Sequence, residues 1–189
     1  IHPEPAISPS RRAPSGRRDM TETLIRISTE RCRIDRLAPA DAPALAAITD
    51  ESVTSQVHFL TAPFTEAAAR RLIAESGADD HFHAVRDGDG LAGVVGVHRR
   101  PGNEYEVGYW FAARSRGRGL AAEAVGAMVR EIAASQPGCT IVAECRPGNS
   151  RSEVLLRRVG FVPTGRAGRR PGRMLFTWRA GPGYRIDVC

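Results

Sequence analysis

The residue types best suited to chemistry gather in residues 114–121, where three arginines and two glycines separate an aromatic run from an alanine-rich one. Glycines such as Gly117 and Gly119 let successive backbone N–H groups crowd around an anion, and the N-terminus of a following helix adds roughly half a positive charge. The pattern therefore predicts a seat for a pyrophosphate. The arginines expected to ring it with forked donors are Arg114, Arg116 and Arg118.

Two other interpretations of this segment stay open from its residues alone. The first is a plain glycine-rich turn. The second is the dinucleotide-binding fingerprint, because residues 117–122 read Gly-Arg-Gly-Leu-Ala-Ala and Glu144 stands at the end of the next expected strand. A dinucleotide-binding fold, however, needs several further strand–helix units after its fingerprint, and few residues follow Glu144. We therefore expect a different pyrophosphate-binding fold.

The first part of the chain is predicted to supply one strand and two helices. Residues 31–37 alternate polar and apolar side chains, which is typical of a strand, and residues 39–49 carry the apolar spacing of a helix. Residues 63–66, Pro-Phe-Thr-Glu, open a second helix. Between the two helices, near residues 52–61, we expect a loop.

Three antiparallel strands are expected next. Residues 81–86 and 91–98 are strand-like runs joined by Asp-Gly-Asp-Gly, a strong hairpin signal. Arg-Pro-Gly-Asn at 100–103 marks a second turn, and 105–111 form a third strand. Gly108 interrupts that strand, where we expect a bulge or a close backbone approach. These strands predict a meander that leads into the glycine-rich segment.

After the glycines the pattern becomes helical again. Residues 120–134 are rich in strong helix formers, and 140–143 form a short apolar strand. Asn149 or Ser150 can cap a further helix that runs to Val159.

The last elements are predicted to complete the sheet. Gly-Phe at 160–161 returns the chain to an extended segment, and 174–179 form the strand that closes the sheet. Three glycines and a proline among the arginines of 165–172 predict a mobile loop between them. The whole pattern predicts an α+β domain with a mixed, mostly antiparallel sheet.

Composition is ordinary for one soluble globular domain. The 189 residues are 42% hydrophobic and 25% charged, and no apolar run approaches the ~20 residues of a membrane span. Four cysteines without Cys-x-x-Cys spacing favour a reducing cytoplasm. Because Met20 directly precedes the first patterned segment, residues 1–19 are expected to be a disordered leader or an upstream extension, 20–180 the domain and 181–189 a short tail.

Charge is unevenly distributed along the chain. The net charge is +6, every basic residue other than histidine is arginine, and residues 146–189 carry ten arginines against two acids. Such a concentration suits phosphates or an acidic partner. Solubility combined with a compositional preference for arginine is the alternative.

Taken together, the quoted residues resemble the GNAT superfamily of N-acetyltransferases. Its cofactor signature is Gln or Arg, two residues, Gly, one residue, then Gly or Ala, and Arg114, Gly117 and Gly119 fill it. The neighbourhood is most similar to the branch of RimJ/RimL type, which modifies ribosomal-protein N-termini, and to its small-molecule relatives.

Four elements carry this resemblance, in family order, across about residues 28–180. Glu-x-Gly-Tyr-Trp at 106–110 precedes the loop, and 117–124 read Gly-x-Gly-x-x-x-Glu-Ala. Downstream, 149–152 are similar to the family's Asn-x-x-Ser and 160–161 to its Gly-Phe.

The resemblance implies a three-layer α+β fold with about six or seven strands, about four helices and a splayed strand pair that holds the cofactor. It also implies acetyl-CoA as cosubstrate, no metal, and direct transfer of acetyl to a primary amine of a small molecule or a protein N-terminus. The positions then assigned to the cofactor are Phe111, Ala113, Arg114, Arg116, Gly117, Arg118, Gly119, Leu120, Ala121 and Asn149.

Catalytic roles follow from the same resemblance. The reaction needs a base for an amine with a pKa near ~8 to 10 and an acid for a thiolate with a pKa near ~8.5. Glu106 matches a glutamate that faces the acceptor amine, and partial burial is expected to raise its pKa. Ser152 matches the residue proposed to protonate the thiolate, while Asn149 bonds the pantetheine or holds its strand. The alternatives are a surface glutamate and a first-turn helix serine.

Two further groups of residues are weighed against this assignment. Many relatives use a tyrosine as the acid, but Tyr105 and Tyr109 both precede the loop, so that position is expected to be unfilled. His81 and His83 share a strand face without a third ligand, which argues against a metal site. His98 is expected to be a polar strand end. Both Cys139 and Cys145 are expected to be buried and without a chemical role.

The expected partner is therefore an amine acceptor, with no membrane, no nucleic acid, and a homodimer left open. Two other function classes are kept beside the enzyme. One is an acetyl-CoA-binding sensor that has lost catalysis, and the other is a basic RNA-associated module, whose binding would depend steeply on salt.

Overall fold

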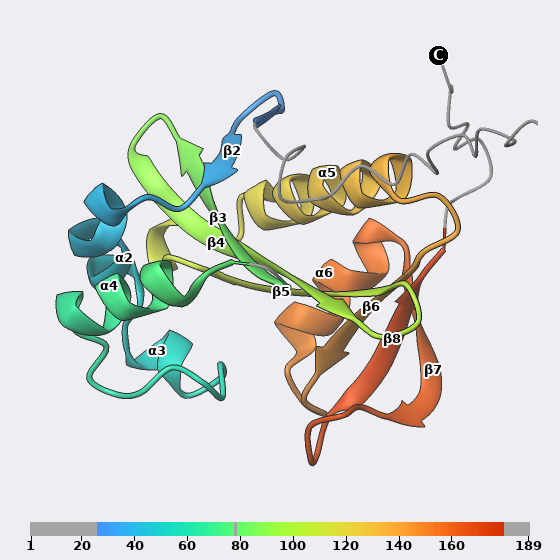
Figure 1. The fold of residues 1–189 in the computed structure, drawn as a ribbon. Helices are drawn as coiled ribbons and strands as arrows, with labels where there is room; N and C mark the ends of the chain where they lie inside the picture. Colours follow the sequence, from blue (N-terminus) through green and yellow to red (C-terminus); the bar gives the residue numbers. More distant parts are fainter. Residues whose placement is uncertain (1–25, 78, 180–189) are drawn as a thin grey trace, which may run out of the picture.

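An eight-stranded sheet runs through the computed structural model, which describes residues 26–77 and 79–179 (Figure 1). The strands lie in the order β1-β2-β3-β4-β5-β6-β8-β7. They are β1 Ile27–Ser28, β2 Arg33–Arg36, β3 Asp80–Asp87, β4 Gly90–Arg100, β5 Glu104–Phe111, β6 Thr140–Cys145, β7 Phe161–Ala167 and β8 Met174–Trp178. The two-residue β1 adds one strand to those expected. The leader 1–19 and the tail 181–189 lie outside the described residues.

β3, β4 and β5 form the antiparallel meander that the sequence predicts, and β1 and β2 extend it on the β3 side with antiparallel pairing. β3 and β4 meet at the pair Asp87↔Gly90, and Gly90 has a φ of 103°, which glycine adopts without steric cost. The bulge expected at Gly108 is wrong, because the β4–β5 register continues through the pair Gly96↔Gly108. The close approach falls on Gly96 instead, where a Cβ would lie 2.9 Å from Nε2 of His98.

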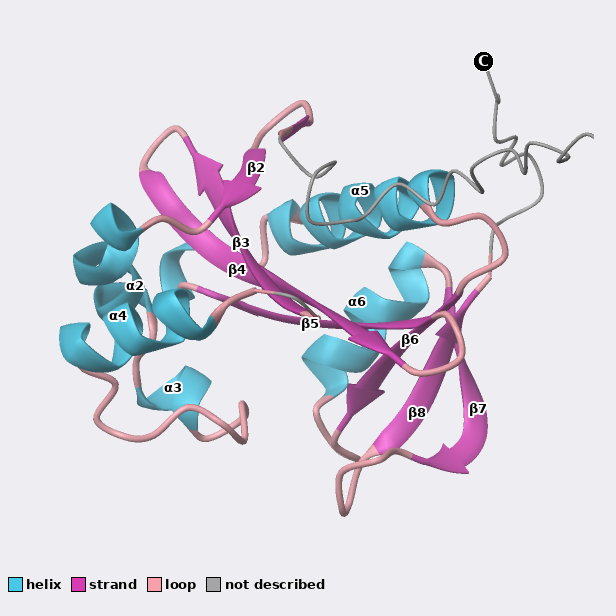
Figure 2. Ribbon diagram, viewed as in Figure 1, coloured by secondary structure: helices cyan, strands magenta, loops and turns pink. Residues whose placement is uncertain are grey.

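Helices cover both faces of the sheet (Figure 2). One face carries α2, α3 and α4, and the other carries α5 and α6. A short helix, α3, lies where residues 52–61 were expected to form a loop; with only four residues it offers no repeat of apolar positions to detect. The helices are α2 Ala42–Ile48, α3 Glu51–Thr54, α4 Glu66–Glu75, α5 Leu120–Ser135 and α6 Ser150–Val159, with 3₁₀ turns η1 Pro39–Asp41 and η2 Ala113–Ser115.

Two apolar cores fill the space between the three layers. Because side chains alternate across a strand, neighbouring residues of β5 enter different cores. Trp110 belongs to the core that includes Leu45 of α2, whereas Phe111 belongs to the core that includes Met128 of α5 and Phe176 of β8. The expected three-layer α+β fold is confirmed.

β5 and β6 are the splayed strand pair that the sequence resemblance implies. They are parallel, and their pairing joins residues 104–106 to residues 140–142. Beyond these positions the two strands diverge, β5 staying with β4 and β6 pairing with β8 (Figure 1). The divergence leaves one edge of β5, at residues 107–111, beside a gap in the sheet.

The end of the chain differs from the expectation in two ways. β8 inserts between β6 and β7, so β7 forms the edge of the sheet and the last strand does not close it. Residues 165–172, predicted to be a mobile loop, are instead the end of β7 and a tight turn in which the N–H of Gly168 donates to the carbonyl of Arg173 at 2.8 Å. This hairpin brings its arginines to the gap between β5 and β6.

Candidate active site

A cavity of about 100 Å³ lies where β5 and β6 separate. Its walls come from residues 56–59 after α3, from β4 and β5, from the end of β6 and the start of α6, and from the β7–β8 hairpin. Phe59, Phe82 and Trp110 form an aromatic wall, with ring centroids 5.8 to 6.2 Å apart. Charged side chains, among them Glu106, Glu144, Arg146, Arg170 and Arg173, line other parts of it, and an apolar wall with a few polar groups is typical of sites that bind small ligands.

Glu106 projects from β5 into this cavity and is only 3% exposed. The alternative of a surface glutamate is therefore wrong. Burial alone would raise the pKa of Glu106, but the guanidinium of Arg170, with His98 and Arg100 nearby, lowers that pKa below its ordinary value. The expected direction of the shift was wrong, because the cation that reverses it comes from a distant part of the chain.

Arg170 bridges Glu106 and Glu144. Its Nη1 lies 2.5 Å from Oε1 of Glu106 and 2.9 Å from Oε2 of Glu144. Glu144 also accepts a hydrogen bond from the backbone N–H of Arg169 at 2.5 Å, and a Cβ on Gly168 would lie 2.7 Å from its Cδ. The hairpin is thus fixed to the end of β6 by a close approach that glycine permits.

A tyrosine stands opposite Ser152, although none was expected there. The hydroxyl of Tyr109 lies 2.9 Å from Oγ of Ser152, and both residues line the cavity. Burial raises the pKa of Tyr109. Sequence reasoning missed this pair because Tyr109 precedes the glycine-rich loop in the chain. The alternation of side chains along a strand could have indicated it, since Tyr109, two positions after Val107, has to face the α5–α6 layer.

Asn149 performs the capping role expected of it. Its side-chain oxygen accepts a hydrogen bond from the N–H of Ser152 at 3.2 Å and so caps α6. We predict that Asn149→Ala lowers the free energy of unfolding by about 1 kcal/mol, whereas Asn149→Asp, which keeps the accepting oxygen, does not. Chemical denaturation of both variants tests this, and an equal loss in the two would contradict a capping role.

The glycine-rich turn has the backbone that its sequence predicts. Gly117 and Gly119 have φ of 75° and 77°, and Gly119 is the N-cap of α5 without a side-chain cap. The amides at the start of α5 therefore have neither an intrahelical nor a side-chain acceptor in the described structure. Among the other assigned positions, Phe111 ends β5, Ala113 begins η2, and Leu120 and Ala121 form the first turn of α5.

Two of the three arginines that were expected to ring the pyrophosphate, Arg114 and Arg116, make other contacts in the structure. The guanidinium of Arg114 donates to the carbonyl of Leu91 at 2.7 Å and pairs with Asp87 at 3.4 Å. Arg116 donates to the carbonyl of Phe111 at 3.3 Å and to Oγ of Ser52 at 2.7 Å. Both side chains therefore bond to acceptors of β3, β4, β5 and α3 in this structure.

Other arginines stand beside the turn, and sequence reasoning missed them. Nη1 of Arg31 donates to the carbonyl of Arg118 at 2.6 Å, and Arg31 also pairs with Glu123 in the first turn of α5 at 2.6 Å. A Cβ on Gly119 would lie 3.4 Å from Arg31 and 3.8 Å from Arg158. Only the fold brings these residues to the loop, since Arg31 precedes the meander and Arg158 lies in the last turn of α6.

A comparison with known families decides between the interpretations of this loop. The family model described as "Acetyltransferase (GNAT) domain" matches residues 31–162, well over half of the chain. The chain belongs to the GNAT acetyltransferase domain family. The dinucleotide interpretation is wrong, because the GNAT sheet enters the loop from an antiparallel meander and Glu144 is held by the hairpin amides.

Individual relatives agree with the family. A ribosomal-protein-serine acetyltransferase of Escherichia coli (strain K12) is 33% identical over 79 residues, which are 41% of this chain and 44% of that protein. The chain thus matches less than half the length of this curated relative. An acetyltransferase (GNAT family) structure from Bacillus anthracis has a TM-score of 0.71 at 24% identity, covering 81% of this chain and 97% of that one.

A third relative is a RimL ribosomal L7/L12 alpha-N-protein acetyltransferase in complex with coenzyme A. Its structure has a TM-score of 0.70 at 14% identity and covers 79% of this chain and 93% of that one. At this identity it shares the GNAT fold. Within the part of this GNAT domain that the structure describes, no helix combines the length and hydropathy that crossing a bilayer requires.

The histidines and cysteines of this GNAT domain occupy varied positions. Among the described residues, no group of three His, Cys, Asp or Glu side chains is placed to hold a metal ion. Burial lowers the pKa of His83 to about 4. His98, expected to be a polar strand end, is buried, lines the cavity and lies 2.6 Å from Asp80. Cys145 lines the cavity as a free thiol, and Cys139 is half-buried.

Proposed function

We propose that this protein transfers the acetyl group of acetyl-CoA to a primary amine that binds beside Glu106. The observation that carries the proposal is that three features meet at one place in the fold. They are a splayed strand pair, a glycine turn at a helix N-terminus and a cavity with a buried carboxylate. Family membership supports acetyl transfer. Two of the relatives are named as acetyltransferases of ribosomal proteins, and these names support a protein N-terminus as the acceptor.

The donor fits the start of α5. The backbone amides at the start of α5, together with the helix dipole, suit a pyrophosphate, and Arg158 adds positive charge nearby, while the charge of Arg31 is shared with Glu123. The pantetheine arm then has the unpaired edge of β5 at 107–111 to bond with, and Asn149 lies across the gap. The coenzyme A complex of the RimL relative supports this donor.

Acetyl transfer makes three chemical demands on the cavity. The amine, an ammonium at neutral pH with a pKa near ~8 to 10, must lose a proton, which Glu106 takes directly or through water. The nitrogen then attacks the thioester carbon and the C–S bond breaks. The nitrogen gives up a second proton as the amide forms. The departing thiolate receives a hydrogen bond from the hydroxyl pair Tyr109 and Ser152, and of the two protons one ends on the thiol and the other in solvent.

The proposal is tested by ligand-dependent thermal unfolding and a thiol-release assay. Acetyl-CoA is expected to raise the melting temperature, whereas NAD is not. Small amines and peptides with free N-termini are then offered as acceptors, and at least one is expected to release thiol. A rise in melting temperature without thiol release from any acceptor would favour the sensor that has lost catalysis.

The basic RNA-associated module has weaker support. Arg169 pairs with Glu104 and Arg170 with two carboxylates, so part of the basic last quarter is already neutralised within the fold. The module requires binding to ribosomal or random RNA at low salt, with affinity falling steeply as salt rises. An absence of binding at low salt would exclude it.

A substitution at Gly117 tests how much the glycine-rich turn contributes to acetyl-CoA binding, independently of the rest of the donor site. A Cβ on Gly117 meets nothing within 4 Å, but its φ of 75° costs an L-residue roughly 1–2 kcal/mol. If alanine shifts the free turn away from this φ and acetyl-CoA has to restore it, Gly117→Ala raises the dissociation constant of acetyl-CoA by about 5- to 30-fold. Gly138→Ala is the matched control, because Gly138 has a φ of 74° and equally open space beyond the far end of α5. Equal affinities in the two variants would contradict the pyrophosphate seat.

A further inference from the structure

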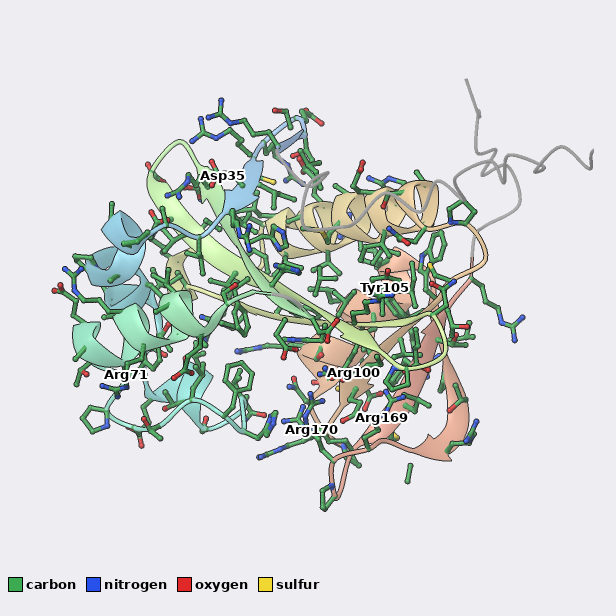
Figure 3. The ribbon with its side chains drawn as sticks, in the orientation of Figure 1. Asp35, Arg71, Arg100, Tyr105, Arg169 and Arg170 are labelled. Carbon is green, nitrogen blue, oxygen red and sulfur yellow. The ribbon has the colours of Figure 1, made fainter. Side chains whose placement is uncertain are left out.

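One guanidinium serves two buried carboxylates inside the cavity. Arg170 contacts Glu106 and Glu144 through Nη1, and the side chains of the two glutamates are only 4% and 1% exposed. Its Nε donates to Nε2 of His58 at 3.1 Å. Figure 3 shows Arg170 on the side of the sheet where the loop after α3 and the β7–β8 hairpin approach each other.

The other charged and titratable groups facing Glu106 do not supply a second full cation. Nε of Arg100 lies 3.3 Å from Oε2 of Glu106, but Arg100 also pairs with Asp80 at 3.2 Å. Burial lowers the pKa of His98 and of His58, which disfavours the cationic form of both rings. Glu106 is therefore balanced by Arg170 and by a shared Arg100.

Glu144 depends on Arg170 more strongly. Its other described bonds come from the backbone N–H groups of Arg169 at 2.5 Å and of Arg170 at 3.4 Å, which carry no net charge. The guanidinium of Arg173 also lines the cavity and acts electrostatically on Glu144, but its described hydrogen bond goes to the carbonyl of Gln56 at 2.9 Å. A buried carboxylate without a nearby cation is strongly unfavourable. The cavity therefore needs a positive charge between Glu106 and Glu144 whenever both are ionised.

We propose that the guanidinium of Arg170 occupies the position that the ammonium group of a bound acceptor takes, and that Arg170 thereby selects acceptors that bind as cations. Because the cavity is the proposed acceptor site, this role rests on the proposed function. A cationic acceptor that displaces the guanidinium still balances the negative charges of Glu106 and Glu144. A neutral molecule that displaces it leaves both carboxylates without a counter-charge. Arg170 has a route out, since it stands near a hairpin tip and its side chain is 24% exposed.

Replacement of the Arg170 guanidinium by the acceptor's ammonium group also accounts for the later steps of the reaction. Once the ammonium lies beside Glu106, its proton passes to that carboxylate, and the freed lone pair attacks the thioester carbon. As the C–S bond breaks, the nitrogen loses a second proton and the product is a neutral amide; one of the two protons ends on the thiolate and the other in solvent. A neutral amide no longer balances the two carboxylates, so the return of Arg170 favours product release.

A binding experiment tests this role without any need for catalysis. Arg170→Ala leaves a gap between the carboxylates, and ~10 mM methylguanidinium is expected to raise the melting temperature of this variant by about 3 °C. Urea, similar in shape but neutral, is expected to have no such effect. Arg169→Ala is the matched control, because Arg169 pairs with Glu104 and does not line the cavity. Arg170→Ser provides a second variant with a similar gap.

Kinetics give an independent readout. Without a competing guanidinium, the KM for an alkylammonium acceptor is expected to fall about tenfold in Arg170→Ala and to stay unchanged in Arg169→Ala. Loss of the cation also raises the pKa of Glu106, and a base is inactive below its pKa. The acid limb of kcat/KM therefore moves to higher pH in Arg170→Ala only.

The outcomes separate the two proposals. A shift with methylguanidinium that is equal in the Arg169 and Arg170 variants, or absent from both Arg170 variants, overturns the role of Arg170. An unchanged or increased KM in Arg170→Ala does the same, because Arg170 then only braces the hairpin. If wild type acetylates no amine, the proposed function fails, while the methylguanidinium measurement still decides whether a cation belongs between the carboxylates.

Discussion

Glutamine in place of Glu106 is expected to lower kcat/KM for the amine acceptor by about 10²- to 10⁴-fold, the range that a positioned general base contributes. Glutamine keeps the size of the side chain and a carbonyl oxygen that Arg170 can bond, but it cannot take the proton of an ammonium. Thiol release at saturating acetyl-CoA measures the loss. The KM for acetyl-CoA is expected to stay the same, because Glu106 lies on the acceptor side of β5.

A matched control is available two residues earlier on the same face of β5. Glu104 also pairs with an arginine, at 2.6 Å from Arg169, but it does not line the cavity. Glu104→Gln is therefore expected to retain wild-type kinetics. If both variants lose activity in proportion to a lower melting temperature, the loss reflects stability, and Glu106 is not the base.

The pH dependence of wild type provides a related check on Glu106. Burial raises the pKa of this carboxyl, but Arg170, His98 and Arg100 lower it below the ordinary ~4.3. A lowered carboxyl pKa means that the base, and the stability from its ion pairs, are fully present above ~4.3 and are lost as the pH falls through the lowered value. No acid limb from Glu106 is therefore expected between pH 5 and 8 in a kcat/KM profile, and a limb there that Glu106→Gln removes would contradict the shift.

Local features of this chain were predictable from sequence because their causes are local. The Asp-Gly-Asp-Gly turn fixed the β3–β4 hairpin, and Asn149 caps α6 through a hydrogen bond three residues along the chain. The same holds for Gly117 and Gly119, whose positive φ follows from the need for a tight turn between β5 and α5. These features position the donor side of the site.

The acceptor side was only partly predictable, because its properties depend on contacts between distant residues. The structure places Glu106, the expected base, in the cavity, yet the direction of its pKa shift depends on Arg170, which reaches it only because β8 inserts between β6 and β7. No local pattern in 165–172 indicates that insertion. Tyr109 was likewise set aside on chain order, although the divergence of β5 from β6 brings it to Ser152.

Phenylalanine at position 109 is expected to lower kcat by about 10- to 150-fold, the effect of removing one hydrogen bond to a charged group. Burial raises the pKa of Tyr109 above the ordinary ~10, whereas a thiolate has a pKa near ~8.5. Complete proton transfer from this phenol to the thiolate is therefore uphill. Tyr109 and Ser152 would act by hydrogen bonding to the developing charge, so no limb from Tyr109 is expected between pH 6 and 9.

A double-mutant cycle distinguishes this pair from two independent groups. The hydroxyls of Tyr109 and Ser152 share a hydrogen bond of 2.9 Å, and Tyr109 also donates to the carbonyl of Ser152 at 3.4 Å, so removing either hydroxyl disturbs the position of the other. The combined variant, Tyr109→Phe with Ser152→Ala, is expected to lose no more than the worse single variant. Since the cap from Asn149 reaches the backbone of Ser152, the Ala substitution leaves α6 intact. Losses that multiply in the double variant would mean that each hydroxyl acts alone, and a loss confined to Ser152→Ala would assign the role to the serine that the sequence suggested.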